Sequence, residues 1–309
     1  SINNIMPEGP EVTILGQYLL SELKGKSFGK MSILGGKYTH KDMDGKTLLN
    51  GKHTYKVINV NSHGKLLWIE LKSDKTIYFV SHLGLSGQWS LIEDDADRIR
   101  IEIVDNNNTY NLCYQDQRNF GNIYIFNDKK KLDKKLEVLS PDALKTQFTG
   151  KDFVDMVKIF LEKRKTKKTT AIFKILMGQT KKDGILSGLG NYLTPEILYH
   201  AKISPSRELQ SLSDIELKTL GNSIKYVIKL AYYNNQTGYM NNFGSFITKH
   251  KKNVDDGIYP NYHADVNLKE RKFTFKVYQQ KKDPFDNPVE KNKTINKGRT
   301  VYWVPNVQI

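Results

Sequence analysis

Residues 6–11 read MPEGPE and place Pro7 directly before the carboxylate of Glu8, with a second acid at Glu11. If a chain begins at Pro7, its nitrogen is a secondary amine, which can attack an aldehyde-like sugar carbon and give an iminium ion. Inside a chain the same nitrogen is a tertiary amide and is not nucleophilic. The structural alternative is a rigid lead-in to a helix whose positive end favours the two acids. Local physics alone favours this alternative.

The chain carries five residues before Met6, and Ser1 is not an initiator residue. We expect residues 1–5 to be an added or upstream segment, with Met6 the start whose removal frees Pro7. The motif therefore predicts chemistry only for a chain that begins at Pro7.

Two kinds of sequence pattern follow this motif. Apolar residues recur every three to four positions over 12–23, the spacing of an amphipathic helix, and short β-branched and aromatic runs separated by turn residues follow. The predicted strands are 55–60, 66–71, 76–80, 98–103 and 122–126. One helix and several short strands predict a β-sandwich or barrel-like domain over residues 1–127.

Residues 127–135 are rich in lysine and have no apolar period, and we expect an exposed linker over 128–140. A helical domain is predicted over 141–268, since apolar faces recur near 153–161, 172–179 and 215–231. The alternating runs 272–278 and 299–304 predict a β-hairpin that forms a final module over 269–309. The fold class is therefore α+β.

A glycine-rich turn at 188–192, GLGNY, opens one of these helices. Glycines before a helix let its N–H groups approach a phosphate, to which Asn191 adds a side-chain donor, although an ordinary helix cap has the same sequence. Eight basic residues and no acid occupy 163–182, a pattern that fits a nucleic-acid backbone.

Bulk properties agree with a polyanionic partner. The 309 residues include 48 Lys+Arg against 33 Asp+Glu, for a net charge of +15, although a solvated basic surface is the alternative. Cys113 is the one cysteine, which excludes an intramolecular disulfide framework and a multi-cysteine zinc site. No apolar run is long enough for a membrane span. We expect a soluble intracellular monomer, with nucleus and cytoplasm not distinguishable.

Taken together, these motifs resemble the formamidopyrimidine-DNA glycosylase and endonuclease VIII family over most of the chain. The hexapeptide 6–11 matches the opening of the family, Lys65 after Gly64 resembles its hairpin lysine, and 82–87 resembles the loop that fills the gap left by an extruded base. Residues 116–121 resemble its second intercalation loop, and 188–192 its helix-two-turn-helix phosphate clamp. Five motifs in the order of the family form a specific match.

The resemblance implies a bifunctional DNA glycosylase and abasic-site lyase of base excision repair, acting by β- or β,δ-elimination without a cofactor. Its partner is DNA with oxidised bases or abasic sites. The implied roles fall into three groups: Pro7 as nucleophile, Glu8 as proton donor, and Lys65 and Glu11 as supporting catalytic residues; Lys174, Gly190, Asn191 and Arg299 as DNA-binding residues; Leu85, Arg118 and Phe120 as void-filling residues. Core packing is the alternative for Leu85 and Phe120, and a pair with Asp116 is the alternative for Arg118.

The final module departs from the family's zinc finger. Asp283, Asp286, Val304 and Val307 stand where the family has cysteines, and valine has no metal-binding atom. We therefore expect no metal and a zincless finger, as in endonuclease VIII-like members, with Arg299 keeping its phosphate-binding role. Residues 238–263 show no recognisable lesion-capping pattern, so oxidised pyrimidines are the favoured substrates. The rival function is a non-catalytic binder of damaged DNA on the same scaffold.

Overall fold

The computed structural model describes residues 6–235, 237–239 and 243–309. The chain divides into two compact units. The first contains residues up to Pro7, Glu11–Glu137 and Gly238–Lys252, and the second contains Glu8–Pro10, Val138–Thr237 and Asn253–Ile309. The expected segment 1–5 lies outside the described residues.

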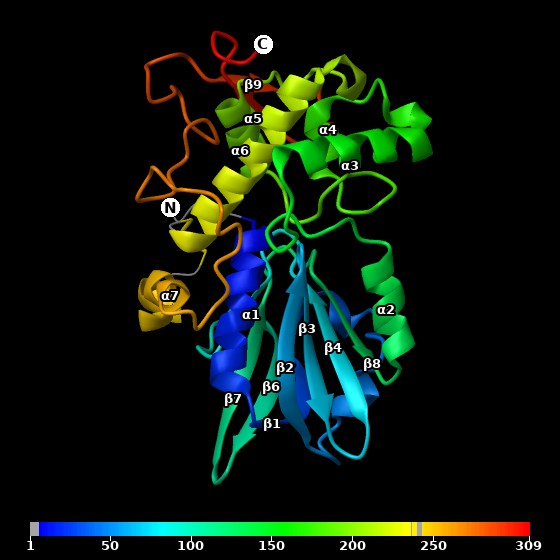
Figure 1. The fold of residues 1–309 in the computed structure, drawn as a ribbon. Helices are drawn as coiled ribbons and strands as arrows, with labels where there is room; N and C mark the ends of the chain where they lie inside the picture. Colours follow the sequence, from blue (N-terminus) through cyan, green and yellow to red (C-terminus); the bar gives the residue numbers. More distant parts are fainter. Residues whose placement is uncertain (1–5, 236, 240–242) are drawn as a thin grey trace. The chain divides into compact units, whose positions relative to one another are not determined.

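The first unit is built on one antiparallel sheet, shown in Figure 1. Its strand order is β5-β7-β6-β1-β2-β3-β4-β8. The bounds are β1 (Ser27–Ile33), β2 (Tyr55–His63), β3 (Leu66–Lys72), β4 (Thr76–His82), β5 (Gln88–Ser90), β6 (Asp97–Asp105), β7 (Asn108–Gln115) and β8 (Asn122–Phe126). All five predicted strands are present. The short turns η1 (Gly36–Thr39) and η2 (Lys46–Leu49) connect β1 to β2.

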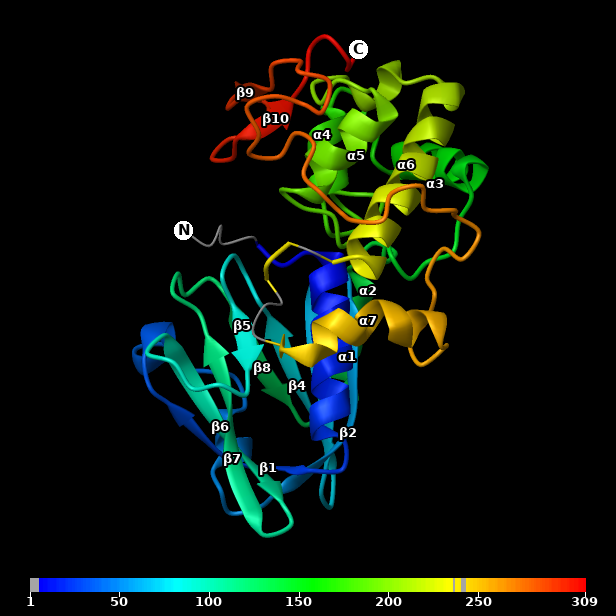
Figure 2. The same cartoon turned by 90° about the vertical axis from the view of Figure 1, so that its left-hand side faces the viewer.

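The sheet folds over on itself to enclose the core of the first unit (Figure 2). Although β5 and β4 are far apart in strand order, the ring of Trp89 lies 5.4 Å from that of Phe79, and its indole N–H donates to Ser81 at 3.0 Å. Buried aromatic side chains thus join the two layers, and the predicted β-sandwich is confirmed.

Helix α1 (Gly9–Leu23) covers this sheet and confirms the helix predicted from the apolar period. Its stripe Val12, Leu15, Leu19 and Leu23 is fully buried. On its other side, Tyr18 stacks on Phe243 with ring centroids 4.4 Å apart, next to helix α7 (Ser245–Asp255).

Residues 128–140 do not form the exposed linker that we expected. They contain helix α2 (Lys129–Glu137), which packs on β4 and β8. Leu132 is buried and Leu136 half-buried, four residues apart on one face, and the Lys135 ammonium lies 3.7 Å from the centre of the Tyr124 ring. Two leucines at helical spacing and a cation–π contact therefore order a segment whose lysines suggested solvent.

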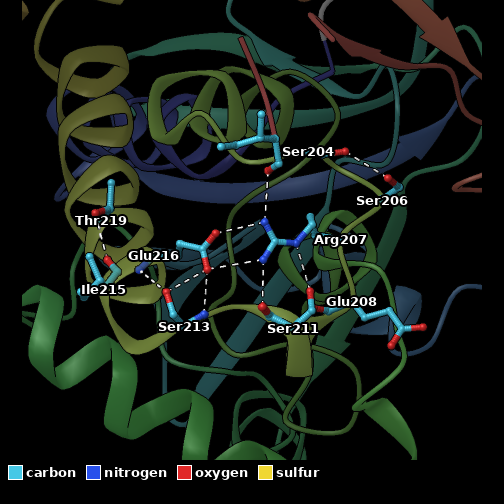
Figure 3. A network of polar contacts seen from close by, with 10 residues as sticks. Ser204, Ser206, Arg207, Glu208, Ser211, Ser213, Ile215, Glu216 and Thr219 are labelled. Carbon is cyan, nitrogen blue, oxygen red and sulfur yellow. Dashed lines mark hydrogen bonds and ion pairs between the residues drawn. The ribbon is translucent and has the colours of Figure 1, made fainter. Parts of the chain in front are cut away.

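The second unit is helical, as predicted. Its elements are α3 (Gly150–Lys163), η3 (Lys165–Lys167), α4 (Ile172–Met177), α5 (Leu193–Ala201), η4 (Leu209–Ser211), α6 (Asp214–Tyr233) and the hairpin β9 (Glu290–Asn292) with β10 (Val301–Trp303). Capping boxes fix the starts of α3, through Thr149 and Asp152, and of α6, through Ser213 and Glu216. Arg207 donates to the carbonyl of Ile309 at 3.2 Å and to Glu216 of the α6 box at 3.0 Å. Figure 3 shows Arg207 beside Glu216 and Ser213.

The predicted pairing of 272–278 with 299–304 is wrong, because the partner of β10 is β9. The backbone N–H groups of Lys276, Val277 and Tyr278 instead donate to the buried carboxylate of Glu196 on α5, at 2.8–3.0 Å. The rings of Phe273 and Phe275 pack edge-on against Tyr192. A buried carboxyl acceptor and an aromatic cluster therefore replace the strand ladder.

Candidate active site and nucleic-acid interface

The residue after Pro7 is held at the start of a helix. Glu8 is fully buried in the second unit, and its carboxylate accepts hydrogen bonds from the backbone N–H groups of Tyr192, at 2.8 Å, and Leu193, at 3.2 Å. These groups lie at the positive end of α5, where an anionic side chain is favoured. The Gly9 N–H donates to the carbonyl of Gly188 at 2.8 Å. The hexapeptide and the GLGNY turn, 180 residues apart in sequence, are therefore in direct contact.

Three further site residues belong to the first unit. Pro7 and Glu11 are buried at the beginning of α1, and Lys65 is half-buried just after the turn residue Gly64, whose φ is +55°. His82 pairs with Leu66, the residue after Lys65, in the β3–β4 ladder. Desolvation and then the positive charges of Lys65, Lys135 and Lys37 lower the pKa of His82. The first unit thus places Lys65 in a cation-rich part of its sheet.

The two loops that resemble the void-filling loops are joined by one buried carboxylate, Asp116. It accepts from the Ser86 hydroxyl at 2.6 Å, from the Gly121 N–H at 2.8 Å and from the Tyr114 hydroxyl at 3.3 Å. The Ser86 oxygen in turn accepts from the N–H of Arg118 at 3.2 Å. Residues 82–87 and 116–121 therefore form one braced structure.

The void-filling candidates project from this brace. Phe120 is 56% exposed, Arg118 is exposed and Leu85 is half-buried, so none of the three is a core residue. None of the described contacts of Asp116 is to the guanidinium of Arg118, which argues against the alternative of an ion pair. Gly84, with φ +66°, lies so close to Phe120 that a Cβ there would be 2.6 Å from its carbonyl carbon. Only glycine fits between the loops at this point.

The phosphate-clamp turn is braced in the same manner. The side chain of Gln179 accepts from the Gly188 N–H at 2.8 Å and donates to the carbonyl of Leu189 at 2.7 Å. Asn191 is half-buried, and its carboxamide oxygen lies 3.5 Å from the Arg299 guanidinium. The structure thus brings together two of the four predicted DNA-binding residues.

The other two DNA-binding candidates differ in setting. Gly190 is buried within the turn, where its carbonyl accepts from the Thr194 N–H at 3.0 Å. Lys174 is exposed on α4, and none of its described contacts reaches Asn191 or Arg299.

Hydrogen bonds and packing occupy the positions of the family's cysteines. Asp283 accepts from the N–H groups of Phe285 and Asn287, each at 2.8 Å, and from the Tyr199 hydroxyl at 2.9 Å. Val304 is buried, and its N–H donates to the Gln308 side chain at 2.7 Å. Asp286 is exposed and Val307 half-buried. Within the described ranges, no three His, Cys, Asp or Glu residues are grouped as a metal site would require.

Sequence reasoning missed several supporting residues. Asp116 entered as the first residue of the run 116–121 and as an alternative partner of Arg118, and Gln179 only as part of a helix face. Tyr239 was not singled out, although its hydroxyl donates to the Gly87 carbonyl at 2.7 Å, and burial followed by the charges of Glu11 and Asp116 raises its pKa. Asp116 and Tyr239 each reach a loop at least 30 residues away, and Gln179 binds backbone groups nine and ten residues further along, contacts that periodicity does not reveal. No described helix is long and apolar enough to cross a bilayer.

Three family models match the chain in order. They are the N-terminal domain of formamidopyrimidine-DNA glycosylase, over residues 6–123, its helix-two-turn-helix domain, over 139–242, and its C-terminal domain, over 264–309. The formamidopyrimidine-DNA glycosylase of Herpetosiphon aurantiacus is 30% identical, over 72% of this chain and 77% of its own length. That of Prochlorococcus marinus strain MIT 9301 is 26% identical, over 98% of this chain and its own entire length.

Solved structures agree in fold. The enzyme of Lactococcus lactis in complex with DNA containing an oxidised pyrimidine is 21% identical, with a TM-score of 0.71, over 98% of this chain and 99% of the other. The MutM (Fpg) protein of Thermus thermophilus is 20% identical, with a TM-score of 0.68, over 98% of both chains. Motifs, fold and relatives agree, and the chain belongs to the formamidopyrimidine-DNA glycosylase family of base-excision-repair enzymes, which are DNA N-glycosylases with abasic-site lyase activity.

Proposed function

We propose that this chain excises oxidised bases, pyrimidines in particular, through a Schiff base on Pro7 and then cleaves the strand by β- or β,δ-elimination. The observation that carries this proposal is the anchoring of Glu8, the residue next to Pro7, by two N–H groups of α5. Such an anchor fixes a carboxylate beside the nucleophile without the use of a flexible side-chain partner.

The proposed chemistry begins with a chain that starts at Pro7. Its secondary amine forms a bond to the sugar C1′, the glycosidic bond breaks, and the electron pair leaves with the base, which takes up the proton that the amine nitrogen loses. Glu8 supplies a proton to the ring oxygen as the sugar opens, which gives an iminium ion. Loss of a C2′ proton then expels the 3′ phosphate, and water releases the enzyme.

Other residues support the extruded state of the DNA. Lys65 brings a positive charge to the phosphate beside the lesion, and Asn191, Arg299, Gly190 and Lys174 contact the backbone. Leu85, Arg118 and Phe120 fill the gap, which offsets the few kcal/mol of stacking lost on extrusion. The exposure of Arg118 and Phe120 on a braced loop supports this role.

Two forms of the protein test the Schiff base. A chain that begins at Pro7 should be trapped covalently by borohydride on abasic-site DNA, whereas a chain that retains residues 1–6 should bind that DNA without being trapped. Glu8→Gln in the Pro7-started chain should impair base release more than trapping on a preformed abasic site. Absence of an adduct with the Pro7-started chain would favour the rival, a non-catalytic binder of damaged DNA. Efficient trapping of the longer chain would identify a different amine.

Lesion preference needs a separate measurement. The Lactococcus lactis relative has been solved with oxidised-pyrimidine DNA, and the valines at 304 and 307 are consistent with an endonuclease VIII-like finger. We expect faster single-turnover excision of oxidised pyrimidines than of 8-oxoguanine, with formamidopyrimidines between them. A panel of duplexes that differ only in the lesion provides the comparison, and faster excision of 8-oxoguanine would reverse the assignment.

A further inference from the structure

Part of the acid-free run 163–182 borders a groove to which the proposed function assigns no role. The groove belongs to the second unit and encloses about 470 Å³ between the C-terminal half of α3, residues 140–141 and residues 181–185. Figure 1 locates α3, which forms one wall.

The floor of the groove is apolar. Met156, Ile159 and Phe160 line it from α3, at the spacing of one helix face, and Ile185 lines it from the opposite segment. Ile159 is 51% exposed. When another apolar side chain covers an apolar floor that is open to solvent, the burial of apolar surface stabilises the complex.

The rim of the groove is cationic. Lys163, Arg164 and Lys181 line it, and no acidic residue does. The Nε of Arg164 is buried and has no hydrogen-bond partner among the described residues, so no carboxylate of that part of the chain binds this nitrogen. The nearby carboxylate of Asp183 is already bound to Lys167, at 3.1 Å. The rim is therefore complementary to negative charge that this part of the chain does not supply.

The groove is also held open. The Ser140 hydroxyl donates to the carbonyl of Gly184 at 2.7 Å, and the Lys181 N–H donates to the carbonyl of Val138 at 3.0 Å. Gly184 itself packs on the backbone of Gly178 so closely that a Cβ would be 2.1 Å from its carbonyl oxygen. A preformed groove binds a ligand without the cost of ordering its own walls.

We propose that this groove binds a partner protein through a short acidic segment that carries aromatic or long aliphatic side chains. The apolar side chains would cover the floor, and the flanking carboxylates would pair with Arg164, Lys163 and Lys181. A DNA backbone also suits the cations, but its phosphates gain nothing from Ile159 and Met156. The combination of floor and rim therefore favours a protein ligand.

Fluorescence anisotropy with a labelled peptide of aspartates around two phenylalanines tests the proposal on the full chain. We expect saturable, salt-sensitive binding. Ile159→Ser should weaken it about tenfold, which corresponds to about 1.4 kcal/mol, and Lys163→Ala about threefold. A peptide with both phenylalanines replaced by serine should bind at least about tenfold more weakly, a comparison that requires no protein variant.

Matched variants provide the controls. Ile215→Ser removes an exposed isoleucine on α6, and Lys168→Ala removes an exposed lysine of the same basic run, and neither residue lines the groove. Both variants should bind the peptide as the parent chain does. Equal binding of the serine peptide would overturn the proposal in favour of unspecific charge attraction. Equal losses of peptide and abasic-duplex binding in Ile159→Ser would identify the groove as a nucleic-acid surface instead.

Discussion

Asp116 offers a test of how the scaffold supports the proposed chemistry, because it contacts both loops that carry the proposed void-filling residues. We predict that Asp116→Ala costs about 3 kcal/mol of unfolding free energy. A hydrogen bond to a charged group contributes about 1.5–3 kcal/mol, and two of the three bonds of Asp116 are short, at 2.6 Å to Ser86 and 2.8 Å to Gly121. In the variant, the hydroxyl of the half-buried Ser86 regains a hydrogen bond to water, which keeps the predicted loss of unfolding free energy near the lower end of the summed range.

The same change should reduce glycosylase activity beyond its effect on stability. Without Asp116, the loops 82–87 and 116–121 would become ordered only on binding DNA and would lose conformational entropy at that step. An added entropic cost of about 1.4 kcal/mol lowers kcat/KM about tenfold. Urea denaturation and single-turnover excision at a temperature where the variant is folded measure the two effects separately.

A buried aspartate elsewhere provides the comparison. Asp142, in the second unit, accepts from the N–H groups of Leu144, at 2.9 Å, and Lys145, at 3.1 Å. Asp142→Ala should also destabilise the fold, but without the tenfold loss of excision rate. If both variants lose activity equally, or if Asp116→Ala changes neither stability nor rate, the assignment of Asp116 as the brace of the void-filling loops is wrong.

Further predictions concern two carboxylates of the second unit, the buried Glu196 and the half-buried Glu216. Glu196→Ala leaves three backbone N–H groups without their acceptor, at about 1–3 kcal/mol each. Urea denaturation should therefore show a loss of at least about 3 kcal/mol of unfolding free energy. The control Glu270→Ala removes only a part-exposed ion pair with Lys276 and should cost less than about 1 kcal/mol. Burial raises the pKa of Glu196 to about 7, against the opposing effect of those N–H donors. The folded chain therefore retains a proton that the unfolded chain loses above about pH 4.5. Stability should fall as pH rises from about 5 to about 7, and Glu196→Gln should remove this slope. For Glu216 the sign is opposite, because a Ser213 N–H and then Arg207 lower its pKa. Arg207→Ala should flatten the loss of stability below about pH 4.5, and an unchanged acid limb would contradict this role.

The sequence predicted the elements whose signals are local. The leucine stripe of α1 and the β-branched runs of β2, β3 and β4 determine their own secondary structure, and the motif order indicated the family. The errors came from interactions that sequence spacing does not show. Lys129–Glu137 is a helix because Leu132 meets the sheet, and 272–278 is not a strand because Glu196 takes up its N–H groups.

The same distinction between local signals and tertiary contacts applies to the candidate site. The identities of Pro7, Glu8 and Asn191 were available from motifs, but the anchoring of Glu8 by α5 and the bracing of Gly188 by Gln179 were not. The first contact joins residues 184 positions apart, and the second depends on how the chain turns between residues 179 and 188; neither follows from a motif or a period.

The clamp at Glu196 also constrains the order of events during folding. Its N–H partners lie 80 to 82 residues further along the chain, so they leave the ribosome long after α5. Until they arrive, burial of the Glu196 carboxylate would leave it without hydrogen-bond donors, which costs free energy. The face of α5 that carries Glu196 is therefore expected to stay hydrated. The helical unit can then mature only late in synthesis. A segment without regular secondary structure near the end of the chain thus sets when the DNA-binding helices become fixed.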